Sequence, residues 1–266
     1  ADGLQELEVL HVAGADLEHV GDLGDTGGVL GAHDLGDDRQ AEKGACLGQQ
    51  LETLEAQALD SVTFHDLYEA YPDLHIDVAR EQQLLLDHDV VVLQHPFYWY
   101  STPAILKEWQ DLVLEHGFAY GTGGDRLAGK WLLLAVTAAG PREAYTERGY
   151  QHHSLRTFLT PLEQTAQLCQ LGFSAPYVLF SSLQAPALGT VGTHVAGYRR
   201  LLEAIRDDRF DFDAAARLYH QANQEQWADK EQPDPHHKRH GHGSPGDGPA
   251  EIDFLLLAEG YLGRIH

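Results

Sequence analysis

The sequence has no methionine, only two cysteines and few basic side chains. Its 18 Lys and Arg residues stand against 41 Asp and Glu residues, so the formal net charge is -23. Cys46 and Cys169 form no CxxC pair and give no disulfide framework, which favours a reducing compartment, with the cytoplasm as the expected location. The acidic excess argues against a nucleic-acid binder, because neutralising phosphates requires clustered Lys and Arg. No stretch reaches the roughly 18 to 20 apolar residues that cross a bilayer, and the first 30 residues do not resemble a signal peptide.

Aromatic side chains are missing from residues 1–60, where ten glycines and fourteen acidic side chains stand beside only two basic ones. Such a composition is typical of a poorly folding segment, so we expect residues 1–50 to supply at best a degraded first strand and helix. Residues 51–229 are the predicted folded domain. Residues 230–250 are predicted to be a His, Pro and Gly linker rather than a metal site, and residues 251–266 a short apolar tail on a flexible C-terminal segment.

Apolar periodicity in the central segment alternates between the spacing of strands and that of helices. The pattern predicts strands at 61–67, 89–95, 131–140 and 176–182, and helices at 76–88, 103–113, 154–172 and 193–207. Thr102 is the expected N-cap of the second helix, with Pro103 as its first residue, and Gly172 is expected to close the third. Strands alternating with helices predict an α/β fold with a doubly wound parallel sheet between two helical layers.

Two predicted loops follow buried strands and carry residues suited to a flat ring. Residues 96–101 (PFYWYS) hold four consecutive aromatics just before a helix start, and residues 137–145 begin with small side chains. Ligands of open α/β sheets bind outside the carboxyl ends of the strands. A helix N-terminus there favours partial negative charge on a ligand, and small residues let a ring approach the backbone. From the residues alone, a flavin site and plain aromatic packing are both open.

A long irregular motif adds a family resemblance. The run HPFYWYSTPAILKEWQDLVLEHGFAYG (residues 95–121), followed by LAVTAAGPREAY (residues 134–145), resembles the flavodoxin-like NAD(P)H:quinone oxidoreductase family. Its nearest branch is that of the ancillary subunits of glutathione-regulated potassium-efflux (Kef) systems. The resemblance covers roughly residues 51–205 and implies a flavodoxin-like fold.

The resemblance also implies an activity and partners. FMN would be the cofactor and NAD(P)H the co-substrate. In a two-electron ping-pong reaction, hydride would pass from NAD(P)H to the flavin, and a quinone would then accept the electrons. A homodimer is expected. The alternative is a regulatory ancillary subunit of a membrane potassium-efflux antiporter, bound at the inner face of the cell membrane, with catalysis secondary or lost.

Residue by residue, the resemblance assigns roles to both loops. The FMN ring would lie between one segment of five residues and one of four: Pro96, Phe97, Tyr98, Trp99 and Tyr100, and Thr137, Ala138, Ala139 and Gly140. Tyr145 would lie near the flavin carbonyl. His152 or His153 would assist charge relay, although either is also readily explained as a surface residue. Trp99 and Tyr120 would line the pocket for nicotinamide and quinone.

The chain departs from the family at the phosphate-binding turn. Residues 28–44 offer Ala32 and His33 but lack the Pro, Ser and Asn that follow in the family, and they carry Asp34, Asp37 and Asp38 instead. A phosphate group binds to backbone N–H groups at a helix N-terminus, and three carboxylates there would repel it. The sequence therefore predicts a ring-binding site with a doubtful phosphate anchor.

Overall fold

The structure is a computed structural model, which describes residues 7–11 and 51–228. The expectations for the acidic turn at 28–44, the His-rich linker at 230–250 and the apolar tail at 251–266 concern residues outside the described ranges.

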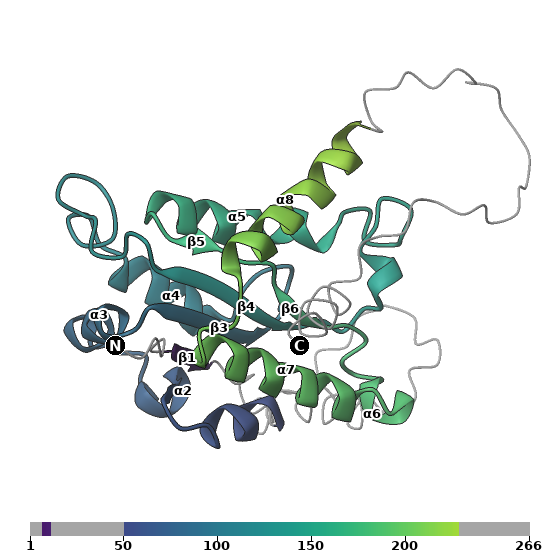
Figure 1. Cartoon of the computed structure of the whole chain (residues 1–266), viewed down its shortest axis with the longest axis horizontal. Coiled ribbons are helices and arrows are strands. Elements are labelled where there is room, and N and C mark those ends of the chain that lie inside the picture. Colours follow the sequence, from purple (N-terminus) through teal and green to yellow (C-terminus); the bar gives the residue numbers. More distant parts are fainter. Residues whose placement is uncertain (1–6, 12–50, 229–266) are drawn as a thin grey trace, which may run out of the picture.

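A parallel sheet forms the centre of the molecule (Figure 1). In the described residues its strands run in the order β2-β1-β3-β4-β5, and β6 also pairs with β4. Every pairing is parallel. The strands are β1 (Leu7–His11), β2 (Val62–Asp66), β3 (Val90–Pro96), β4 (Trp131–Thr137), β5 (Gly172–Phe173) and β6 (Tyr177–Leu179). The order reverses between β1 and β3, which is the switch point where ligands bind in this class of sheet.

The acidic first segment supplies a strand inside the sheet. β1 lies between β2 and β3, with Leu7 opposite Val62 on one side and Val90 on the other. Leu7, Val9 and Leu10 are buried. Composition averaged over fifty residues concealed these five, because a buried parallel strand needs only a short apolar stretch.

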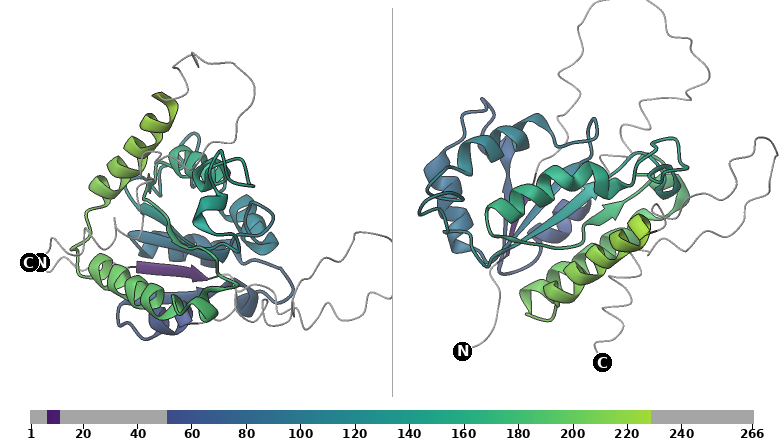
Figure 2. Two further views of the ribbon diagram at one scale, coloured as in Figure 1. Left: turned by 90° about the vertical axis from the view of Figure 1, so that its right-hand side faces the viewer. Right: turned by 90° about the horizontal axis from the view of Figure 1, so that it is seen from above.

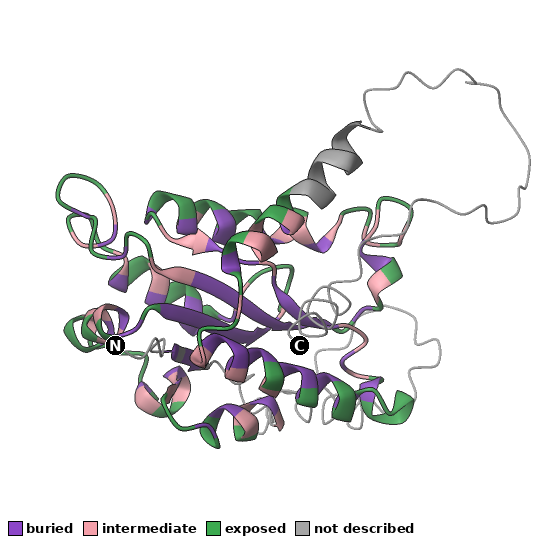
Figure 3. Cartoon of the chain, viewed as in Figure 1, coloured by how far each residue is buried: buried purple, intermediate pink, exposed green. Residues whose placement is uncertain are grey.

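Helices cover both faces of the sheet (Figure 2). They are α2 (Leu67–Ala70), α3 (Val78–Asp87), α4 (Ala104–Val113), α5 (Leu155–Leu168), α6 (Ala185–Leu188), α7 (Val191–Arg206) and α8 (Phe212–Ala228), with a 3-10 turn η2 (Arg142–Ala144). Residues 51–57 are also helical. Leu93 of β3 packs in one apolar cluster with α4 and α5, while Val92 packs on the other face with α7. The inner strands β3 and β4 are therefore buried on both sides over most of their length, as Figure 3 shows, whereas β2 at the edge is mostly half-buried.

Two helix ends differ from those expected. Helix α4 begins at Ala104, with Pro103 in the N-cap position and no side-chain cap, so Thr102 is not the cap. Helix α5 ends at Leu168 with Cys169 as its C-cap, and Gly172 lies in β5 instead. A Cβ on Gly172 would lie 2.3 Å from the Trp131 ring, so this glycine allows close approach to the indole rather than ending a helix.

Helix α8 was not anticipated and packs at the β5 side of the sheet. The rings of Phe212 and Trp131 stack at 4.8 Å between centroids. The guanidinium of Arg156 on α5 lies 4.0 Å from the centre of the Tyr219 ring and also forms a 2.7 Å ion pair with Glu163. The first contact attaches α8 to β4, and the contact of Arg156 with Tyr219 attaches it to α5, the helix that follows the second predicted loop.

Candidate functional site

The two predicted loops lie side by side at the carboxyl edge of the sheet. Pro96 at the end of β3 pairs with Thr137 at the end of β4, and the Phe97 N–H donates to the Thr137 carbonyl at 2.8 Å. Adjacent parallel strands end at the same edge, so the segments that follow them meet there. This placement brings together the residues of the two expected ring-binding segments.

The aromatic loop contains a tight turn with unusual backbone geometry. Tyr98 and Ser101 exchange two backbone hydrogen bonds of 3.1 and 2.9 Å, and the two residues between them have left-handed backbone angles, with φ of 48° at Trp99 and 63° at Tyr100. This is the geometry of a type I′ turn, which favours Asn and Gly. A bulky residue in this region costs about 1 to 3 kcal/mol, and such strain concentrates at functional sites.

The strained turn exposes aromatic surface. The Trp99 side chain is 93 % exposed, and Tyr98 and Tyr100 are about half exposed. An exposed indole on a strained turn contributes nothing to the folded core, so its place in the chain calls for an external contact. A planar ligand or a second protein surface would provide that contact.

The buried side of the site is an aromatic cluster drawn from four segments. The Phe97 ring lies 6.1 Å from Tyr145 and 5.9 Å from Phe158, and Tyr100 stacks on Phe158 at 5.0 Å. Phe180, just after β6, lies 5.7 Å from Tyr145. Phe158 and Phe180 were not among the expected site residues, because each reads from the sequence as an ordinary core position. Their rings fix the positions of both loops.

The second loop offers less free surface than its small residues suggest. Ala138 is fully buried; its N–H donates to the Leu179 carbonyl, and its own carbonyl accepts from the Ser182 N–H. Thr137 is buried as well. Ala139 is exposed, and a Cβ on Gly140 would lie 3.1 Å from the Tyr145 ring. Gly140 is buried beneath the Tyr145 ring and the Tyr150 hydroxyl, so Ala139 is the member of this segment that is open to a ligand.

Tyr145 lies against Gly140, and neither candidate histidine reaches it. Burial raises the pKa of the Tyr145 phenol, the nearby Tyr150 raises it further, and a hydrogen bond from the Gly140 N–H opposes them. His152 and His153 are exposed, and the His153 ring meets Phe158 edge-on at 5.7 Å. Among the described residues no hydrogen bond joins either imidazole to Tyr145. The role of His152 or His153 in charge relay stays a prediction.

The expected substrate residues lie on separate segments. Tyr120 is half-buried and packs edge-on against His116 at 5.6 Å. Because Trp99 is 93 % exposed, it does not pack against Tyr120 within the described chain. A pocket that used both residues would need the bound ligand, or another chain, to join them.

Buried His95 ends β3 directly before the aromatic turn. Its Nδ1 lies 2.9 Å from the Pro96 carbonyl, so Nδ1 carries the proton and donates. Burial lowers the pKa of this imidazole to about 4, so it is neutral near pH 7. Nε2 is buried and has no hydrogen-bond partner in the described part of the chain. His95 therefore fixes the backbone at the start of the loop.

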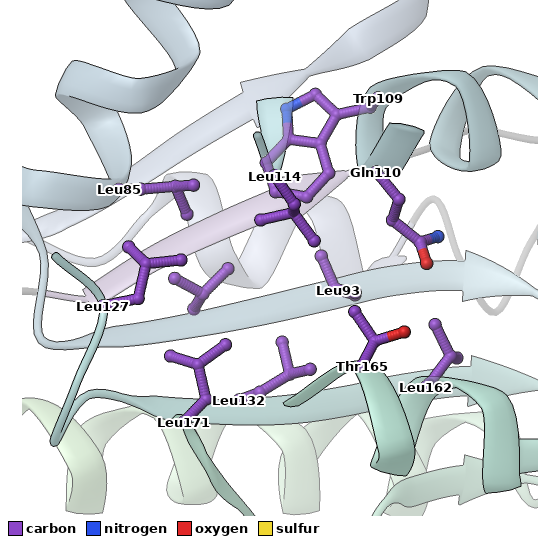
Figure 4. A pocket seen from close by; sticks show the side chains of 11 residues that line it. Leu85, Leu93, Trp109, Gln110, Leu114, Leu127, Leu132, Leu162, Thr165 and Leu171 are labelled. Carbon is purple, nitrogen blue, oxygen red and sulfur yellow. The ribbon is translucent and has the colours of Figure 1, made fainter. Parts of the chain in front are cut away.

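Two further hollows in the described residues lie away from the two loops. Figure 4 shows Leu93, Trp109 and Leu162 meeting around an apolar cavity of about 30 Å³, roughly the volume of one water molecule. An open groove of about 430 Å³ runs along β2 past His65 and Arg80. Both are lined by residues outside the two loops.

The family model described as "Flavodoxin-like fold" matches residues 29–202, which is more than half of the sequence. The chain belongs to this flavodoxin-like family. A curated relative, the glutathione-regulated potassium-efflux system ancillary protein KefG of Cronobacter sakazakii, is 44 % identical to the flavodoxin-like chain over 147 residues. That alignment covers 55 % of this chain and 79 % of the relative.

The solved structures that are similar to this chain carry the names of different kinds of protein. General stress protein 14 of Treponema denticola, in complex with FMN, is 29 % identical with a TM-score of 0.57 and covers 75 % of this chain and 99 % of its own. A thermophilic tryptophan halogenase from Streptomycin violaceusniger is 32 % identical, with a TM-score of 0.56 and coverage of 73 % and 96 %. An NADPH-quinone reductase from P. pentosaceus, at 21 % identity, TM-score 0.56 and coverage of 74 % and 97 %, shows the fold alone. Because one fold carries several reactions, the reaction must be argued from the site.

Proposed function

We propose that the protein is an FMN-dependent NAD(P)H:quinone oxidoreductase with a two-electron ping-pong reaction. The observation that carries the proposal is the strained turn at the end of β3, which presents exposed Trp99 on a loop whose Phe97 ring contacts Tyr145. The similarity to a protein solved with FMN supports it. Asn or Gly at Trp99 and Tyr100 would relieve the backbone strain of the turn, so the presence of large aromatic residues there points to a functional role.

The residues at the loops fit the ring of FMN. The backbone of Pro96 to Tyr100 would border one side, and Ala139 the other, because Ala138 is engaged in the fold and Gly140 is buried beneath the two phenols of Tyr145 and Tyr150. The Tyr145 phenol would donate a hydrogen bond at the carbonyl edge of the ring, since its raised pKa keeps the proton in place. Bound FMN would supply the hydride chemistry. The phosphate end concerns residues outside the described ranges.

The remaining roles concern access of the substrates. Trp99 would stack on nicotinamide or quinone, which suits an exposed indole. Tyr120 would close the pocket from a separate segment, either around the ligand or across a homodimer in which a second copy covers Trp99. Neutral aromatic side chains exclude water from the reacting face, and a dry site strengthens the hydrogen bond from Tyr145.

Titration of the purified full-length protein with FMN tests the proposal. We expect the visible absorption of FMN to co-elute with the protein in gel filtration, and the bound flavin to bleach with NADH or NADPH and recover with a quinone. Trp99→Ala should lower the rate of one half-reaction or both. Leu168→Ala, which removes another exposed apolar side chain at the far end of α5, should not. Absence of FMN binding at excess cofactor would refute the proposed enzymatic function.

A second candidate function is that of an ancillary subunit of a potassium-efflux antiporter, bound at the inner face of the cell membrane. The observation in its favour is the 44 % identity to KefG. None of the described helices combines the length and apolar character needed to cross a bilayer, so such a role would act through the antiporter. Co-purification with the antiporter, repeated with Tyr145→Phe, would separate the functions, because an ancillary role without catalysis needs no phenol donor.

A further inference from the structure

Two phenol hydroxyls converge on Gly140. A Cβ at this glycine would lie 2.8 Å from the Tyr150 hydroxyl and 3.3 Å from the Tyr145 hydroxyl. The Tyr145 side chain is buried, whereas Tyr150 is 64 % exposed and reaches Gly140 from the surface. The small residue thus leaves room for two donors at the inner edge of the site.

The position of Tyr150 is fixed by the loop that carries Tyr145. The Gln151 N–H donates to the Ala144 carbonyl at 3.1 Å, and the Gly149 N–H donates to Thr146 Oγ1 at 2.9 Å. A Cβ on Gly149 would lie only 2.3 Å from the Glu143 carbonyl oxygen, so the chain here presses against η2. An exposed tyrosine is therefore held on an ordered backbone, which preorganises its hydroxyl.

Few other side chains compete for this position. Tyr100 and Tyr150 are the phenols that act on the Tyr145 hydroxyl, together with the Gly140 N–H. Arg142 from η2 lies over the Phe180 ring at 4.7 Å. His152 is turned by a left-handed backbone with φ of 60°, and His153 packs on Phe158. The second donor next to Tyr145 is a phenol rather than an imidazole.

We propose that Tyr150 supplies, together with Tyr145, hydrogen bonds that stabilise negative charge on a reduced flavin ring bound against the two hydroxyls. For this role the family resemblance pointed to His152 or His153. The inference rests on the proposed FMN function. A neutral phenol donates one hydrogen bond and gives up no proton, so the residue acts by stabilising charge that appears on reduction.

The two-electron midpoint potential of FMN bound to the full-length protein tests this role. A hydrogen bond to a charged group contributes about 1.5 to 3 kcal/mol, so Tyr150→Phe should make reduction at least roughly tenfold less favourable. For a two-electron couple, that tenfold change is about 30 mV toward negative potential. Tyr68→Phe, which removes a half-buried phenol on α2, is the matched control and should leave the potential unchanged.

Two further variants separate the possible outcomes. His152→Ala combined with His153→Ala should shift the potential less than Tyr150→Phe does. Gly140→Ala places a methyl group against both hydroxyls and should weaken FMN binding. An unchanged potential in Tyr150→Phe, or a larger shift in the histidine pair, would overturn the inference while FMN binding still supported the enzyme. If the unsubstituted protein bound no FMN, both the role of Tyr150 and the proposed FMN-dependent function would be refuted.

Discussion

Replacing Trp99 by Asn should stabilise the protein and impair its function at the same time. The backbone of Trp99 is left-handed, with φ of 48°, and L-residues pay about 1 to 2 kcal/mol in that region. Asn tolerates it by bonding locally to its own backbone, and it is favoured in type I′ turns. Because the Trp99 side chain is 93 % exposed, the substitution gives up almost no packing. The expected gain is about 1 kcal/mol in the free energy of unfolding.

Leu74 provides a matched control for this prediction. It is also left-handed, with φ of 62°, and its side chain is 51 % exposed, but it lies in the loop between α2 and α3. Leu74→Asn should therefore stabilise the protein by a similar amount and leave quinone reduction unchanged. Urea unfolding of both variants at one pH measures the free energies, and half-reaction rates measure the function.

The outcomes distinguish strain from packing. If Leu74→Asn stabilises and Trp99→Asn does not, Trp99 makes a contact that its exposure hides, and the strain argument fails for this turn. If Trp99→Asn stabilises but keeps full activity, the turn is strained without serving the reaction. Stability gained with activity lost is the pattern of a residue retained for function.

Three further predictions concern buried polar groups. Glu81→Gln should cost about 3 to 5 kcal/mol in urea unfolding, because one carboxylate oxygen accepts from Trp109 Nε1 at 2.8 Å and the other from Tyr71, whereas an amide has one acceptor oxygen and its NH2 group would face one of these donors; a loss below about 1 kcal/mol would contradict this. Because buried His95 is neutral, the protein should lose stability as pH falls from 6.5 toward 4, since the imidazole of the unfolded chain gains its proton first. The free energy of unfolding should fall by about 3 kcal/mol, and this loss should vanish in His95→Phe. Identical pH dependence of unfolding in both proteins between pH 7 and 4 would exclude this effect of His95. Arg156→Ala should leave buried Glu163 with only the 3.8 Å contact to His220, cost about 3 kcal/mol and speed amide exchange in α8, whereas unchanged exchange would show that Phe212 and Tyr219 alone attach the helix.

Much of the fold followed from the sequence because parallel strands buried on both faces have a strong pattern. The run at 89–95 and the helix at 193–207 both correspond to observed elements, β3 and α7. The meeting of the two loops also followed, since neighbouring strands end together. β1 could not be found in this way, because five residues inside a long acidic segment leave little trace in an average.

The details of the site were less accessible. No Gly or Asn marks the turn at Trp99 and Tyr100, so its left-handed geometry has no local signal. Phe158 read as a core position of a helix, and only the folded chain shows its ring against Tyr100. Tyr150 was overlooked because the family resemblance pointed to the histidines that follow it. Contacts between side chains distant in sequence depend on packing, which periodicity does not encode.

A strained turn persists only if its surroundings prevent it from relaxing, and here one of the restraints is remote from the turn. On one side the turn follows the β3 ladder. On the other it leads into α4, whose Trp109 donates to buried Glu81 on α3, and Glu81 also accepts from Tyr71 and contacts His65 at 2.9 Å. The hydrogen bonds lower the pKa of Glu81 although burial alone would raise it, so the carboxylate stays charged and keeps accepting from Trp109 near pH 7. Weakening the hydrogen bonds at Glu81 should let α4 shift and the turn relax. Glu81→Gln should therefore reduce FMN affinity although Glu81 lies outside the site.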